Sequence, residues 1–172
     1  MSWIRDNLSI LNYPFSIGLW SGVEKMPITF KVLPQERLVV ITHHGTVPDD
    51  EFLSFYNSLS ENRQIDKTFN ALINLQNTES SARSPESLLL LARKLRERYE
   101  VNEKSRPKIA IFAPGNVSFG MARMFESFSR TVKRSFGVFR TMPAALNWLE
   151  LPESLADEIS KDVPLAEPSG AE

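Results

Sequence analysis

Two short and almost wholly apolar segments constrain the fold of this chain most. They are residues 69–75 (FNALINL) and 108–113 (KIAIFA), and each is followed by a loop and then by a helical pattern. Strands with so few polar positions are typical of a sheet whose two faces are both covered by helices. Strands that alternate with helices of about 10–15 residues predict βαβ units with right-handed crossovers.

The remaining elements follow from the same two periodicities. Residues 28–32 alternate apolar and polar side chains, and residues 37–43 are β-branched and apolar after a turn at Pro34, so the two segments predict an antiparallel hairpin. A last short strand is expected at 136–140. Helices are expected at about 48–59, 84–99, 117–130 and 141–149. The expected fold class is α/β, in the order β-β-α-β-α-β-α-β-α, with a mixed, mostly parallel sheet of four to five strands flanked by helices.

The chain of 172 residues has the length of one domain. We expect an N-terminal accessory segment at 1–26, a folded domain at 27–151 and an acidic, flexible tail at 152–172. The charge is uneven, because residues 83–140 hold 13 Lys and Arg against 5 Asp and Glu, whereas residues 141–172 hold one against seven. These regions are either ordinary solvated surfaces, or they attract each other, or each meets its own partner.

The composition excludes several classes of function. The chain has no cysteine, which excludes disulfides, thiolate nucleophiles and zinc–thiolate sites. The apolar run at 88–92 is far shorter than the ~20 residues of a membrane span, and no signal-peptide pattern is present, so a cytoplasmic location is expected. A pI near 6.2 argues against nucleic-acid binding, and no cofactor motif is present.

Several motifs in residues 27–150 resemble those of the SpoIIAA-like family of bacterial STAS-fold proteins. The motifs are a hairpin leading into Gly45-x-Val47-x-Asp49-x-Glu51, the strand end Ala113-Pro114, the segment Phe119-Gly120-Met121-Ala122-Arg123-Met124-Phe125-Glu126, and Val138-Phe139-Arg140-Thr141 followed by Ala144-x-x-x-Trp148-Leu149. The resemblance implies a SpoIIAA-like sheet flanked by helices and a function that is generally non-enzymatic.

In the better understood STAS proteins the domain binds a protein partner and is switched by phosphorylation of a serine at the start of a helix. The resemblance places that position within residues 76–85, where the family's Asp-Ser-Ser/Thr-Gly pattern is absent. Ser80, Ser81 and Ser84 are the candidate phospho-acceptors, since a helix N-terminus stabilises a phosphate. Ordinary loop and N-cap roles account for the same serines.

Two further groups of residues are candidates for chemistry. His43 and His44 are adjacent on a predicted strand, so they point to opposite faces and do not chelate one metal ion together. One of them is a candidate general base, with Asp49 or Asp50 to orient it, although one solvent-facing and one satisfied buried histidine is the plainer interpretation.

A second candidate site is the turn between the strand at 108–113 and the helix that follows. Gly115, Asn116 and Ser118, with Arg123, form a candidate loop for an anion or another ligand, because open α/β sheets bind ligands at the carboxyl ends of their strands. Helix capping explains the same residues. The methionines and phenylalanines of the helix at 117–130 line either a core or a cavity for an apolar ligand.

The leading hypothesis from the sequence is a non-enzymatic binding or regulatory domain that acts through a protein partner or as a homo-oligomer. The alternative is a carrier or sensor of a small apolar, lipid-like or anionic ligand. An enzyme that uses His43 or His44 is the third hypothesis. No assembled catalytic set or metal site is visible in the sequence.

Overall fold

The computed structural model describes residues 27–62, 65–78, 83–99, 107–132 and 134–160. The expected accessory segment at 1–26 lies outside the described residues. The elements are β1 (Ile28–Leu33), β2 (Leu38–His44), α1 (Asp49–Glu61), β3 (Asn70–Asn77), α2 (Pro85–Tyr99), β4 (Lys108–Phe112), α3 (Asn116–Phe128), the 3₁₀ turn η1 (Ser129–Thr131), β5 (Ser135–Phe139), α4 (Met142–Trp148) and α5 (Leu155–Ser160).

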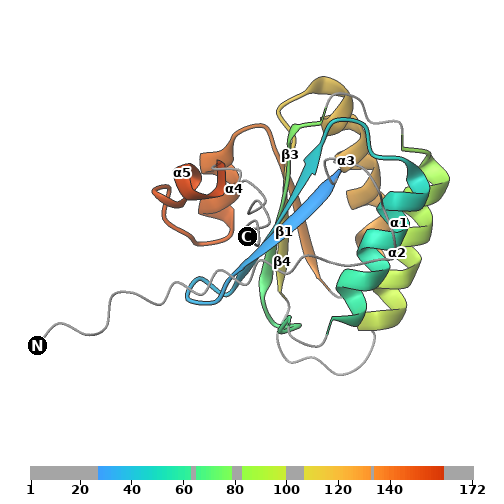
Figure 1. The fold of residues 1–172 in the computed structure, drawn as a ribbon, viewed down its shortest axis with the longest axis horizontal. Coiled ribbons are helices and arrows are strands. Elements are labelled where there is room, and N and C mark those ends of the chain that lie inside the picture. Colours follow the sequence, from blue (N-terminus) through green and yellow to red (C-terminus); the bar gives the residue numbers. More distant parts are fainter. Residues whose placement is uncertain (1–26, 63–64, 79–82, 100–106, 133, 161–172) are drawn as a thin grey trace, which may run out of the picture.

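The five strands form one sheet in the order β1-β2-β3-β4-β5. β1 pairs with β2 in antiparallel register, and each later strand is parallel to the strand before it. Each of the three crossovers connects a strand to the next strand in the same direction across the sheet. Because all three connections are right-handed, their helices must cover the same face. Figure 1 shows α1, α2 and α3 on one side of the sheet and α4 and α5 on the other. The predicted fold class is confirmed.

Alternating side chains of the strands feed two separate cores. In β2, Val39 and Ile41 belong to the cluster under α1–α3, whereas Leu38 and Val40 belong to the cluster under α4 and α5. Strand geometry requires this alternation, since successive side chains point to opposite faces. The sheet is therefore buried on both sides, which explains why its strands carry so few polar residues.

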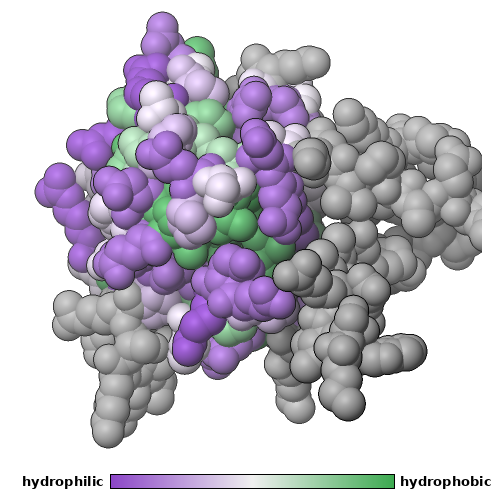
Figure 2. Space-filling model, turned by 90° about the vertical axis from the view of Figure 1, so that its left-hand side faces the viewer, coloured by the Kyte–Doolittle hydropathy of each residue, from purple (hydrophilic) through white to green (hydrophobic). Residues whose placement is uncertain are grey.

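The face under α4 and α5 is covered by two short helices only. Thr141 is the N-cap of α4, since its side chain accepts a hydrogen bond from the Ala144 amide. Hydrophobic residues remain partly exposed around this cluster, namely Phe139, Trp148, Leu151 and Ala156. Figure 2, which views the molecule from this side, shows hydrophobic surface at the centre of the face with hydrophilic residues around it.

One element differs from the expectation. The acidic tail was predicted to be flexible from residue 152, yet residues 155–160 form α5 and pack on the sheet. Leu155 and Ile159, four residues apart, are both buried against the α4 cluster. Lys31 of β1 also donates a hydrogen bond to the Glu158 carbonyl. This stretch is acidic, but Leu155 and Ile159 lie on one side of a helix. These two residues are enough to pack a short helix on the sheet.

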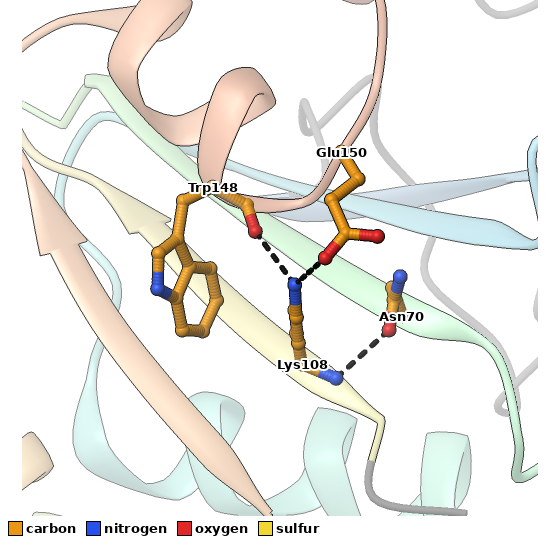
Figure 3. A network of polar contacts seen from close by, with 4 residues as sticks. All are labelled: Asn70, Lys108, Trp148 and Glu150. Carbon is orange, nitrogen blue, oxygen red and sulfur yellow. Dashed lines mark hydrogen bonds and ion pairs between the residues drawn. The ribbon is translucent and has the colours of Figure 1, made fainter.

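A polar network fastens α4 to the amino ends of β3 and β4 (Figure 3). The Lys108 ammonium donates to the Trp148 carbonyl at 3.0 Å and to the Glu150 carboxylate at 2.6 Å. The backbone amide of Lys108 donates to the side-chain oxygen of Asn70 at 2.8 Å. The network joins three elements that are distant in sequence, and we assign it a structural role.

No helix within the described part of the chain is both long and apolar enough to cross a bilayer.

Candidate functional site

A small cavity of about 50 Å³ lies between the sheet and the three crossover helices. It is partly open to solvent and sits toward the carboxyl ends of β2, β3 and β4. Its lining residues are His43, Phe52, Tyr56, Ile73, Leu75, Thr78, Arg83, Leu88, Leu91, Ile111, Ser118, Met121, Ala122 and Phe125. An apolar wall with a few polar groups at one place is the usual composition of a ligand site, and carboxyl strand ends are its usual position in α/β folds.

His43 anchors the polar part of this cavity. It is almost wholly buried, at 2% exposure, and both ring nitrogens have partners. Nδ1 lies 3.1 Å from an Arg83 guanidinium nitrogen, and Nε2 lies 3.1 Å from the Tyr56 hydroxyl. Since a guanidinium can only donate, Nδ1 must accept, and a neutral ring then carries its proton on Nε2. Burial first, and then the charge of Arg83, holds the pKa of His43 well below its ordinary value of 6.5.

Tyr56 is held as a neutral phenol. It comes from α1, where its ring packs against Phe52 and the His43 ring. Its oxygen accepts the hydrogen bond from His43 Nε2, so its own hydroxyl hydrogen is available to another acceptor. Burial raises the pKa of Tyr56 well above 10, only partly opposed by Arg83, which keeps that hydrogen in place.

Arg83 is the charged residue of the cavity. Its guanidinium stacks on the Phe52 ring, with Cζ 4.1 Å from the ring centroid, and donates through Nη2 to His43. Its second terminal nitrogen, Nη1, is buried and has no hydrogen-bond partner among the described residues. No ion pair joins Arg83 to a carboxylate within the described part of the chain. Burial lowers the pKa of Arg83, whereas Tyr56 and Asp49 act in the opposite direction.

The nearest acidic residue serves another purpose. The Asp49 carboxylate accepts the Ser84 hydroxyl at 2.6 Å and the Ser84 amide at 3.2 Å. Ser84 in turn caps α2, because its Oγ accepts the Ser87 amide at 3.1 Å. Burial by itself raises the pKa of Asp49, but the hydrogen bonds from Ser84 outweigh it and keep the pKa below its usual value. Asp49 therefore orients the start of α2, and within the described part of the chain no hydrogen bond joins it to His43.

The predicted phospho-acceptors are only partly described. Ser84 takes the N-cap position that the sequence indicates, with its hydroxyl on Asp49. Ser80 and Ser81 lie outside the described residues. Whether any of the three accepts a phosphate stays a prediction.

The predicted ligand loop is divided by the fold. Ser118 lines the cavity and donates to the Gly115 carbonyl at 3.1 Å. Asn116 accepts a hydrogen bond from Arg140, which also binds the Pro114 carbonyl. Arg123 lies elsewhere, paired with Glu126 beside a second, more polar cleft. Of the four loop residues, the fold brings only Ser118 to the cavity wall.

That second cleft, of about 600 Å³, lies at the end of α3 and the start of β5, and Arg130 and Arg134 also line it. In the sequence, Arg130 and Arg134 lie within a basic stretch that also contains Lys133 and Arg140. Arg140, however, lies at the other end of β5 and stacks on Phe119, while Lys133 is outside the described residues. The basic residues thus divide between the two ends of one strand.

The adjacent histidines point to opposite faces, as predicted. His44 turns to the other side of the sheet, where its Nε2 lies 3.3 Å from the Thr29 hydroxyl. Over the described ranges, no three His, Asp or Glu side chains gather closely enough to hold a metal ion. Residue pattern alone did not identify Tyr56 and Arg83 as partners of His43. Tyr56 stands in an ordinary apolar stripe, and Arg83 stands in a polar loop.

Fold and site together define a mixed α/β domain with a small, mainly apolar cavity that is lined in part by a partly buried arginine. No protein-family model matches the chain, and no curated protein matches it either. A search of solved structures finds an uncharacterized protein from the DUF3478 family with a SpoIIAA-like fold, from Shewanella loihica PV-4. The two sequences are 17% identical, the match covers 77% of this chain and 99% of that chain, and the TM-score is 0.47. The similarity is to a protein of the kind that the sequence motifs resemble, and it brings no function with it.

Proposed function

We propose that this protein is a binding domain for a small molecule, which it holds in the cavity between the sheet and α1–α3. One observation carries the proposal: the Arg83 guanidinium is turned into an apolar cavity without a carboxylate partner among the described residues. Withdrawing part of a charged group from water costs free energy unless new partners replace the lost hydration, and Arg83 Nη1 has no such partner among the described residues. A ligand that enters the cavity would supply that partner.

The proposal includes no turnover. The residue most suited to catalysis is His43, and both of its nitrogens are already engaged by Arg83 and Tyr56. A general base needs a free nitrogen within reach of the proton that it removes. We therefore favour a carrier or sensor role over a reaction.

The regulatory role through a protein partner, which the family resemblance implies, stays a prediction. Among the described residues, Leu89 and Leu90 on α2 are large hydrophobic side chains with substantial exposure. Two neighbouring leucines are a small patch, and single exposed hydrophobics are normal on protein surfaces. The cavity is the stronger basis for a function.

The test uses methionine methyl groups as reporters on both faces of the sheet. Met121 lines the cavity, and Met142 is buried in the other core. The full chain, labelled with ¹³C-methyl methionine, is titrated with propionate, propionamide and 1-propanol, which share a three-carbon skeleton. We expect at least one of them to shift the Met121 signal saturably and to leave Met142 unmoved.

The matched control is Ala122→Met, which fills the cavity from α3 with a flexible side chain. It should abolish the response at Met121. If none of the three probes shifts Met121 in the wild type, or if all act equally on the filled variant, the proposed function is wrong.

A further inference from the structure

We infer that the ligand is a short-chain monocarboxylate whose carboxylate group is bound by Arg83, Thr78 and Tyr56. The inference rests on the proposed function and specifies its ligand. It follows from three properties of the cavity: the kind of polar groups that face it, the absence of acidic residues in its wall, and its size.

The polar groups with unused capacity are hydrogen-bond donors. Arg83 Nη1 and Thr78 Oγ1 are both shielded from solvent, and neither has a partner among the described residues. The Tyr56 hydroxyl hydrogen is also unspent, since its oxygen accepts from His43. All three residues line the same cavity. A ligand group that accepts several hydrogen bonds at once satisfies them, and a carboxylate has two such oxygens.

The charge in the cavity favours an anion. Arg83 contributes a full positive charge, and no Asp or Glu is among the lining residues. Ser118, which also lines the cavity, lies in the first turn of α3, where the helix dipole adds positive potential. A neutral amide would use some of the donors but would leave the guanidinium charge uncompensated. A primary ammonium ion would be repelled.

The size of the cavity limits the rest of the ligand. A volume of about 50 Å³ admits a few heavy atoms, given that one water molecule needs ~10–15 Å³ of such space. Most of the remaining wall is apolar and includes Ile73, Leu91 and Phe125. An acid with one to three carbons beyond the carboxylate matches that space, whereas a long fatty chain does not fit inside.

The titration that tests the function also tests this inference, because the probes differ only in their head group. At pH 7.5 we expect propionate to bind about 10- to 100-fold more tightly than propionamide, the range of a charge-assisted hydrogen bond to arginine. Arg83→Gln should remove most of this preference. Thr78→Val, which keeps the side-chain shape, should weaken propionate binding by a smaller factor.

The two proposals fail in different ways. Equal binding of propionate and propionamide would leave the cavity as a ligand site and overturn the carboxylate assignment. Sodium chloride is a further control. If chloride shifts the Met121 signal and propionate then causes no additional shift, the site is a simple halide site and the carboxylate assignment is overturned. If Arg83→Gln does not fold, as judged by circular dichroism, Thr78→Val decides: unchanged propionate affinity in that variant contradicts the inference. If none of the three probes shifts the Met121 signal of the wild type, both proposals are wrong.

Discussion

Lys108 and Arg83 are both cations held close to an aromatic ring, and their surroundings differ. The Lys108 ammonium has a carbonyl and a carboxylate as partners, and its side chain is 31% exposed. The Arg83 guanidinium donates a hydrogen bond to His43 and keeps a buried nitrogen that has no partner among the described residues. The cluster around Lys108 is complete as it stands, which is the mark of a structural network. The cluster around Arg83 is not, which is why we place the ligand there.

The apolar surroundings of the two cations differ in the same way. Next to Lys108, Trp148 packs on Phe139, and both rings lie so close to Gly137 that a side chain there would have to displace a ring. Next to Arg83 there is a cavity. The α4–α5 face is closely packed at Gly137, whereas the α1–α3 face contains the cavity, so added volume should have different consequences at these two places.

The largest expected effect comes from adding atoms to each face in turn. A Cβ at Gly137 would lie 2.7 Å from the Phe139 ring and 3.2 Å from Trp148, so Gly137→Ala should lower the free energy of unfolding by about 1–3 kcal/mol. Ala122→Met adds more atoms but directs them into the cavity, and should change stability by less than about 1 kcal/mol. Urea denaturation of both variants measures the difference. If Ala122→Met lowers the free energy of unfolding more than Gly137→Ala does, the cavity does not accommodate the added side chain.

The sequence predicts this architecture well and the cavity poorly, and the reason is physical. Strand alternation determines that His43 and His44 face opposite sides, and the prediction is confirmed because the period of two depends on the local backbone alone. The partnership of His43 with Tyr56 and Arg83 depends on how α1 and the segment before α2 approach β2. These groups are 13 and 40 residues away from His43 in the chain. No local period encodes such a distance.

The second prediction compares the pH at which each cluster loses stability. The pKa of His43 is below 6.5 in the folded protein, so between that pKa and 6.5 the unfolded chain binds more protons, and stability falls as the pH falls. The slope is at most about 1.4 kcal/mol per pH unit for one group. Hydrogen bonding and the charge of Lys108 lower the pKa of Glu150, so its contribution is lost only as the pH drops below about 4.5.

Urea denaturation at pH 7.5, 6.0 and 5.0 separates the two windows. His43→Gln should flatten the loss of stability over this range, whereas Glu150→Gln should leave its slope as in the wild type. His44→Gln is the matched control, since it removes the neighbouring imidazole and leaves His43 in place, and it should keep most of the slope. If His43→Gln keeps the full slope instead, His43 is not the buried neutral histidine that the cavity requires.

The smallest effect is expected at Glu150, where two contributions oppose each other. Its backbone has φ of 63°, a left-handed conformation that glycine adopts at no steric cost after a helix end. Glu150→Gly relieves that strain but removes the carboxylate from Lys108, which keeps the Trp148 carbonyl. The side chain is 81% exposed, so its ion pair is weak, and the melting midpoint should move by no more than about 2 °C. A complete network tolerates the loss of one member at its exposed edge. A fall of 5 °C or more would show that Glu150 holds α4 on the sheet, and the contrast with Arg83 would then lie in exposure rather than in completeness.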